Sequence, residues 1–168
     1  MKQCIVIVML FFVSVLSLKA QENRLQKSDV ALLCGAWEGT LTYLDYTTGK
    51  PYTMPANVMI SSIKGSDHLL VQMDYPDEPK ANSTDTLHLS GGGMMIDGEK
   101  IVSREVLTDG TVKVVSEEQG KDGNDNKSAT FRFTRTISND VYEVMKEVRF
   151  DGEKTWVLRH IYSYKRKS

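Results

Sequence analysis

The feature that most constrains the fold is an alternation of apolar and polar residues with a period of two. It is clearest at residues 37–43, 69–75, 131–137 and 142–150, and it is typical of half-buried antiparallel strands. Turn signals such as Asp97-Gly98, Asp109-Gly110 and Asn139-Asp140 separate such stretches, and these pairs tolerate the backbone angles of tight hairpins. The intervals between turns leave no room for crossover helices, so the strands should form sequential hairpins.

A meander of this kind can form a sandwich or close into a barrel, and closure removes the exposed strand edges. We expect an all-β fold: a single up-and-down antiparallel barrel of about 8–10 strands with a short N-terminal helical turn. Closure should place residues 36–46 beside residues 154–165. The length of 168 residues fits one such domain.

The first twenty residues have the pattern of a cleaved secretory signal peptide. Lys2 supplies a positive start, residues 5–18 are almost wholly apolar, and Ala20 is the small residue expected before a cleavage site. The apolar run is shorter than the ~20 residues that cross a bilayer. We therefore expect export to the periplasm or the extracellular space, and a mature chain without a transmembrane span. The chain divides into a signal peptide at 1–20, an N-terminal segment with the helical turn at 21–34, and the barrel domain at 35–168.

Cysteine content and charge limit the partners. Cys4 would leave with the signal peptide, so Cys34 would stand alone, and its place after Leu32 and Leu33 favours a buried apolar role over a nucleophilic one. The chain has 21 Lys and Arg against 22 Asp and Glu, which gives no support to a nucleic-acid partner. We expect a monomer.

Gly35-Ala36-Trp37 follows the helical turn and opens the first strand, and Arg159 lies in the last apolar segment. A Gly-x-Trp in this place, followed by a meander and a terminal Arg, resembles the lipocalin and calycin barrels, and the chain is similar to their small exported bacterial members. The resemblance implies that Arg159 packs on Trp37 and closes one end of the barrel, with Gly35 at the start of the strand. A guanidinium over an indole gains cation–π attraction, so this role would be structural.

Few residues suggest catalysis or a metal. His68, His88 and His160 have no metal-ligand spacing, no serine lies in a nucleophile turn, and we expect no catalytic residue, no metal and no cofactor. His88 should face solvent. His160 shares its parity with Trp156, Leu158 and Tyr162, so it should face the interior, either as a hydrogen-bonded core residue or as a contact for a ligand or a haem.

Two cations share the parity of the apolar strand faces. Arg135 alternates with Phe131, Phe133 and Ile137, and Lys146 with Tyr142, Val144 and Val148. Because a buried cation is costly unless paired, each needs either a neighbouring carboxylate, such as Glu105 or Glu117, or a ligand anion. The candidate lumen residues for a ligand are Tyr43, Phe133, Arg135, Lys146 and His160.

Two functions remain open. In one, the barrel binds a small apolar or amphipathic molecule in its lumen without catalysis. In the other, the barrel is filled with side chains and serves as a structural or protein-interaction module of the bacterial cell envelope. The volume of the internal cavity separates them, since pockets for drug-sized ligands measure about 300–1,000 Å³.

Overall fold

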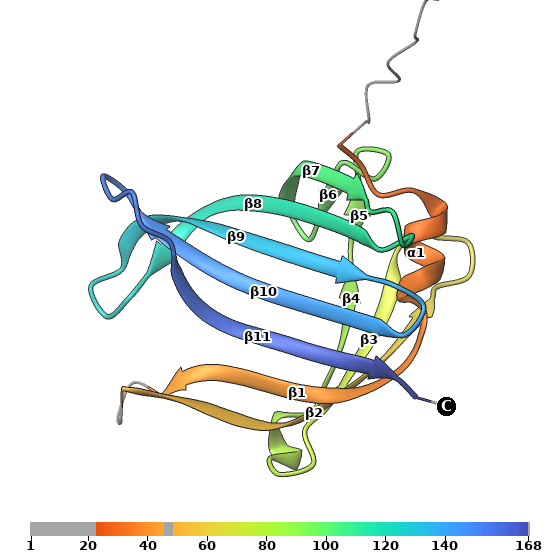
Figure 1. Ribbon diagram of the computed structural model, residues 1–168, viewed down its shortest axis with the longest axis horizontal. Coiled ribbons are helices and arrows are strands. Elements are labelled where there is room, and N and C mark those ends of the chain that lie inside the picture. Colours follow the sequence, from red (N-terminus) through yellow and green to blue (C-terminus); the bar gives the residue numbers. More distant parts are fainter. Residues whose placement is uncertain (1–22, 46–48, 168) are drawn as a thin grey trace, which may run out of the picture.

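The computed structural model describes residues 23–45 and 49–167, and the predicted signal peptide at 1–20 lies outside them (Figure 1). Antiparallel strands in one sheet make up most of the described chain, as the alternation predicts. The elements in chain order are α1 (Lys27–Leu33), β1 (Gly35–Asp45), β2 (Lys50–Ser62), β3 (Leu69–Asp74), a 3₁₀ turn (Pro79–Ala81), β4 (Ser83–Leu87), β5 (Leu89–Ser90), β6 (Met95–Ile96), β7 (Glu99–Val106), β8 (Val112–Asp122), β9 (Lys127–Ile137), β10 (Val141–Phe150) and β11 (Val157–Arg166). None of the helices in the described ranges is long and apolar enough to span a bilayer.

The first and last strands pair side by side, as expected from the sequence. The sheet has eleven strands in the order β4-β3-β2-β1-β11-β10-β9-β8-β7-β6-β5, and every pairing is antiparallel. The register sets Trp37 opposite Arg166 and Tyr43 opposite His160. The eleven strands exceed the expected 8–10 because the count includes β5 and β6, which are only two residues long each and too short to show an alternation in the sequence.

The two edges of the sheet are consecutive in the chain. β4 ends at Leu87 and β5 begins at Leu89, so His88 alone separates the two edge strands. Leu87 pairs with Leu69 of β3, whereas Leu89 pairs with Ile96 of β6. The chain therefore changes pairing partner at His88, and this covalent step holds the barrel nearly closed.

The helix α1 lies at one end of the barrel, next to the end of β11 (Figure 1). Its Asp29 is buried and accepts two hydrogen bonds of 2.7 Å from the Arg104 guanidinium on β7. Trp37 is 1% exposed, and its indole N–H donates to the Leu33 carbonyl at 2.9 Å. A buried ion pair and a buried indole therefore fix the helix over the core. Cys34, at the end of α1, is only half-buried, and its Sγ lies 3.5 Å from Ser62 Oγ.

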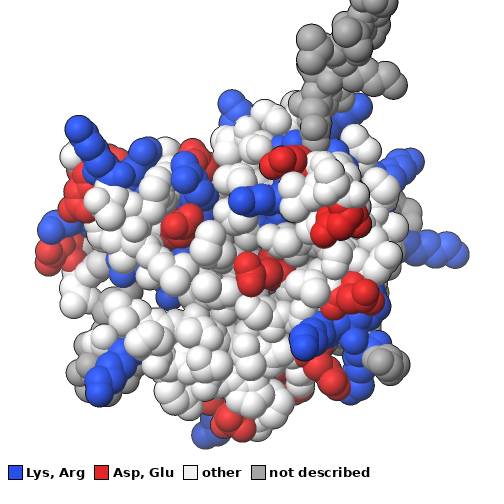
Figure 2. All heavy atoms as spheres, in the orientation of Figure 1, with Lys and Arg blue, Asp and Glu red and all other residues white. Residues whose placement is uncertain are grey.

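The outer face over the middle of β11 and β1 is poor in charge, and acidic side chains lie next to it over β10, as Figure 2 shows. The register places Met145, Ile161 and Thr42 side by side there. Lys, Arg, Asp and Glu side chains of both signs surround this area.

A β-bulge in β11 reverses the expected parity of its first residues. Lys146 pairs with His160 and Glu147 with Leu158, so Arg159 is the extra residue. One extra residue moves all side chains before it to the opposite face. The expectation that Trp156 faces the interior with Tyr162 is therefore wrong, because Trp156 lies on the opposite face. Leu158 is 47% exposed, and the guanidinium groups of Arg132 and Arg149 lie 3.8 and 4.7 Å from the centroid of the Trp156 ring.

The prediction that Arg159 packs on Trp37 is wrong, and Arg166 has that place instead. The Arg166 guanidinium lies 4.0 Å from the centroid of the Trp37 ring. It also donates hydrogen bonds to the carbonyls of Leu32 at 2.7 Å, Cys34 at 2.9 Å, and Asn139. Arg159 is seven residues away along β11, about 20 Å at the rise of a strand, and donates to Asp122 at 2.7 Å.

Candidate functional site

The candidate lumen residues from the sequence lie on the inner rows of four neighbouring strands. Tyr43 is opposite His160, His160 is opposite Lys146, and Lys146 is opposite Phe133. Arg135 is two residues further along β9 and is buried. The structure therefore brings all five together on one inner surface, but it gives the two cations very different surroundings.

Arg135 is fully paired inside the barrel. It donates to both oxygens of Glu99 at 2.7 and 3.1 Å and to Ser116 Oγ at 2.8 Å. The Ser116 hydroxyl donates to Glu99 in turn at 2.5 Å, and all three residues are buried. The partner is Glu99 of β7 rather than Glu105 or Glu117, and Glu117 instead pairs on the outer face with Arg132. With its donors used in this way, Arg135 is a structural residue and not a free site for an anion.

Lys146 is the interior cation without a carboxylate in contact. Its ammonium lies 4.3 Å from the centroid of the Phe131 ring and 5.3 Å from that of Phe133. Among the described residues, no carboxylate forms an ion pair with it. Glu118 on β8, opposite Phe131, acts on Lys146 from a longer distance. Burial and the nearby Glu99 carboxylate raise the pKa of Glu118, whereas Lys146 lowers it.

His160 adds an uncharged polar group beside Lys146. Burial, and then the positive charge of Lys146, lowers the pKa of His160 to about 4. The imidazole is therefore neutral at physiological pH. Its ring packs edge-on against Tyr162, with centroids 5.4 Å apart.

An apolar pocket of about 180 Å³ lies next to the Lys146–His160 pair, on the side of the neighbouring inward pair Val144 and Tyr162. Val144 and Tyr162, the next inward residues on β10 and β11, form part of one wall, and Val58, Val71 and Leu87 lie on the other strands that line it. The Tyr162 hydroxyl is 2.9 Å from that of Tyr75. Burial raises the pKa of Tyr162 and of Tyr164, so both phenols are neutral donors or acceptors.

The rest of the lumen, toward α1, is filled. The rings of Trp37 and Tyr142 lie 5.7 Å apart, and Tyr142 stacks on Tyr164 at the same separation. Tyr142 and Tyr164 also line the small apolar pocket, so this aromatic packing borders the pocket on the side toward α1.

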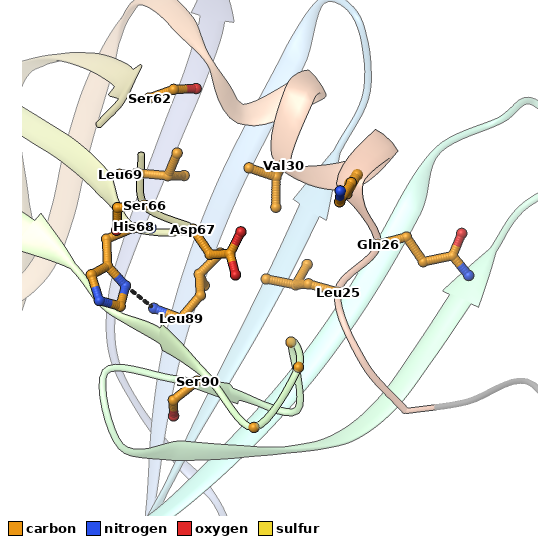
Figure 3. Close-up of a pocket in the computed structure, with 14 residues that line it drawn as sticks. Leu25, Gln26, Val30, Ser62, Ser66, Asp67, His68, Leu69, Leu89 and Ser90 are labelled. Carbon is orange, nitrogen blue, oxygen red and sulfur yellow. Dashed lines mark hydrogen bonds between the residues drawn. The ribbon is translucent and has the colours of Figure 1, made fainter. Parts of the chain in front are cut away.

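A second and larger cavity, which we call the rim pocket, lies beside α1 and has a volume of about 480 Å³ (Figure 3). Three segments enclose it: residues 25–30, the turn before β3, and the Gly91–Gly93 turn between β5 and β6. The Leu25 N–H donates to the Gly93 carbonyl at 2.8 Å and ties two of these walls together.

His68 closes the side of the rim pocket next to the sheet edges. Its Nδ1 accepts a hydrogen bond of 3.1 Å from the Leu89 N–H, the dashed line in Figure 3. This fixes the tautomer with hydrogen on Nε2. The His88 ring packs edge-on against His68, with centroids 4.9 Å apart, and His88 is exposed, as expected. Within the described ranges, no cluster of three or more His, Cys, Asp or Glu could hold a metal ion.

The fold and its interior define a nearly closed antiparallel β-barrel with paired and unpaired charges in its lumen. No protein-family model and no curated protein matches the sequence. Among solved structures, Rv2717c from M. tuberculosis matches 84% of this chain and 96% of its own, with 14% identity and a TM-score of 0.55.

A protein of unknown function from the DUF3598 family of Nostoc punctiforme also matches, with 18% identity and a TM-score of 0.46. That match covers 86% of this chain and 50% of the Nostoc protein. Neither name states a ligand. At 14% identity, the likeness to Rv2717c concerns the fold alone.

Sequence reasoning missed the rim pocket and the partner of Arg135. Leu25, Asp67 and Gly93 carry no shared motif, and the chain brings them together only because two turns and the N-terminal segment meet at one end of the barrel. The Gly91-Gly92-Gly93 run was the one sequence feature that could have pointed to the rim pocket, because three consecutive glycines allow a close approach of another chain segment. All three have positive φ, and a Cβ on Gly93 would lie 2.5 Å from the Leu25 carbonyl oxygen.

Proposed function

We propose that this protein is an exported, lipocalin-like barrel that binds a small amphipathic anion in its lumen without catalysis. The observation that supports this most is the position of Lys146, an interior cation held against aromatic rings with no carboxylate in contact, next to an apolar pocket. A ligand anion at Lys146 would supply the missing charge, and the apolar part of the same ligand would enter the pocket.

The size of the pocket limits the ligand. An engineered cavity of about 150 Å³ holds one benzene molecule. The lumen pocket of about 180 Å³ therefore fits a single ring or a short chain, and falls below the range of drug-sized ligands. The rings of Tyr162 and Tyr164 line the pocket and are nearly parallel, with an interplanar angle of 10°. They favour a ligand with a planar ring, since aromatic pairs gain free energy beyond the area they bury.

A titration calorimetry experiment tests the proposal with benzoate and hexanoate as probes and benzyl alcohol as the uncharged comparison. We expect both anions to bind and benzyl alcohol to bind at least several-fold more weakly. Lys146→Met should weaken anion binding roughly tenfold, because it removes a desolvated charge partner while keeping the side-chain length. Glu118→Gln should strengthen it, because the opposing carboxylate is lost.

The matched control is Lys113→Met, which removes an exposed lysine from the outer face of β8 and should leave binding unchanged. Anion binding that is indifferent to Lys146→Met would contradict the proposal. If neither anion binds, the barrel is better described by the alternative function, a structural or protein-interaction module of the cell envelope. The filled half of the lumen favours that alternative.

A further inference from the structure

The rim pocket is a separate cavity that the lumen proposal does not use. Its volume of about 480 Å³ lies within the range of small-molecule sites, and it is larger than the lumen pocket. Its lining residues come from the segment at residues 25–30, from strand ends and from turns at one end of the barrel, and none of them lines the lumen pocket.

The floor of the rim pocket is apolar. Leu25 and Val30 lie on the α1 side, and Leu69 and Leu89 lie on the sheet side (Figure 3). Leu25, Leu69 and Leu89 belong to the buried core, so this floor is held in place by the barrel itself. A floor of aliphatic side chains binds an aliphatic group of similar size by excluding water from both.

Two opposite charges lie at the rim on different walls. Asp67 is in the turn before β3, and its carboxylate points into the space between the two pairs of apolar residues (Figure 3). Lys27 opens α1 on the other side. Within the described part of the chain, neither side chain forms an ion pair. One free carboxylate and one free ammonium therefore border the same apolar floor.

Most of the other polar groups of the rim pocket are already used. Ser66 Oγ accepts the His68 N–H at 3.0 Å, His68 Nδ1 accepts the Leu89 N–H, and the Gly93 carbonyl accepts the Leu25 N–H. These bonds fix the walls and leave the recognition of a ligand's charges to Asp67 and Lys27.

We propose that the rim pocket binds a small apolar zwitterion: a free amino acid with an aliphatic side chain. The ammonium of the ligand would pair with Asp67, its carboxylate with Lys27, and its side chain would cover the Leu25, Val30, Leu69 and Leu89 floor. The proposal does not depend on ligand binding in the lumen.

Backbone amide NMR of the ¹⁵N-labelled protein tests this with L-leucine, N-acetyl-L-leucine and L-leucinamide. The two derivatives each lack one of the ligand charges. L-leucine should shift the amide signals of Gly91, Gly92 and Gly93 and leave those of Val144 and Tyr162 unchanged. Each derivative should bind several-fold more weakly than L-leucine.

Two variants assign the charges. Asp67→Asn should weaken L-leucine and L-leucinamide by roughly 2–5-fold, the strength of an exposed ion pair, and leave N-acetyl-L-leucine unaffected. Lys27→Gln should weaken L-leucine and N-acetyl-L-leucine by a similar factor and leave L-leucinamide unaffected. Asp77→Asn and Lys80→Gln, which are exposed between β3 and β4, are the matched controls.

Three results would overturn the proposal: no shift of the Gly91–Gly93 amides at millimolar L-leucine, shifts confined to lumen residues, or L-leucine affinities that both variants leave unchanged. Lys146→Met distinguishes the two sites, because it should weaken benzoate binding in the lumen roughly tenfold and leave the L-leucine shifts as they are.

Discussion

Replacing Arg166 by alanine should destabilise the barrel far more than replacing Arg159. The Arg166 guanidinium lies 4.0 Å from the centroid of the buried Trp37 ring and donates to three backbone carbonyls at the end of α1 and in the β9–β10 turn. A desolvated cation–π contact contributes up to about 2 kcal/mol, and each hydrogen bond about 0.5–1.5 kcal/mol net. Because Arg166 is half-buried, water replaces part of these bonds after truncation. We expect a loss of about 3–4 kcal/mol in the free energy of unfolding.

Urea unfolding at fixed pH, followed by tryptophan fluorescence and circular dichroism, measures this loss from the midpoint and the m-value. Arg166→Lys should recover part of it, since a lysine keeps a charge over the indole but cannot reproduce the three-way guanidinium contacts. Arg159→Ala serves as the control and should cost about 1 kcal/mol, because Arg159 pairs with the half-buried Asp122. If Arg166→Ala unfolds within 1 kcal/mol of the wild type, or if Arg159→Ala costs more, Arg166 does not close the barrel.

Three other outcomes are expected. Glu99→Gln should cost about 3–5 kcal/mol in urea unfolding because it leaves Arg135 buried and unpaired, and the double variant Glu99→Leu, Arg135→Met should cost less than either single change; additive losses would contradict this. The pKa of His160 is about 4 in the folded state and near 6.5 in the unfolded state, so the unfolded chain takes up its proton first as the pH falls from 6.5 to 4. The free energy of unfolding should therefore fall by about 1–2 kcal/mol between pH 6.5 and pH 4, after allowance for solvent screening. His160→Gln should remove this part of the pH dependence of stability. N-terminal sequencing of the exported protein should begin at Gln21, and a mature chain that retains residues 1–20 would exclude the signal peptide.

The alternation of side chains was enough to predict the barrel and the pairing of its first and last strands. A period of two is a local signal, and it survives wherever strands are regular. It fails where one residue is inserted. The bulge at Arg159 reversed the parity of Trp156 and Leu158, and nothing in the local sequence marks it. The choice of Arg159 for the contact with Trp37 came instead from the resemblance, which implies an arginine of the last strand there; Arg166, further along the same strand, has that position.

The interior charges were predicted in part. The parity of β9 and β10 correctly directed Arg135 and Lys146 inward, because both strands are regular up to Lys146. The partner of Arg135 could not be predicted, since it depends on the register of β7. That strand follows two strands of only two residues and has its own irregularity between Ile101 and Ser103. Register over such short pairings is weakly specified by sequence.

The step from one sheet edge to the other at His88 makes this fold a natural candidate for circular permutation. β1 and β11 are neighbours, and the Lys167 N–H donates to the Ala36 carbonyl at 2.9 Å, so the two ends of the barrel's chain already lie together. A permutant that begins at Leu89, runs through β11, continues by way of α1 into β1 and ends at Leu87 would have every strand beside its neighbour in sequence. The longest-range pairing would become local, which should speed folding. The edges would then be joined by no covalent bond, so the cylinder would be held shut by non-covalent contacts across the seam, among them the His68–Leu89 hydrogen bond and the core packing of Leu69 and Leu89.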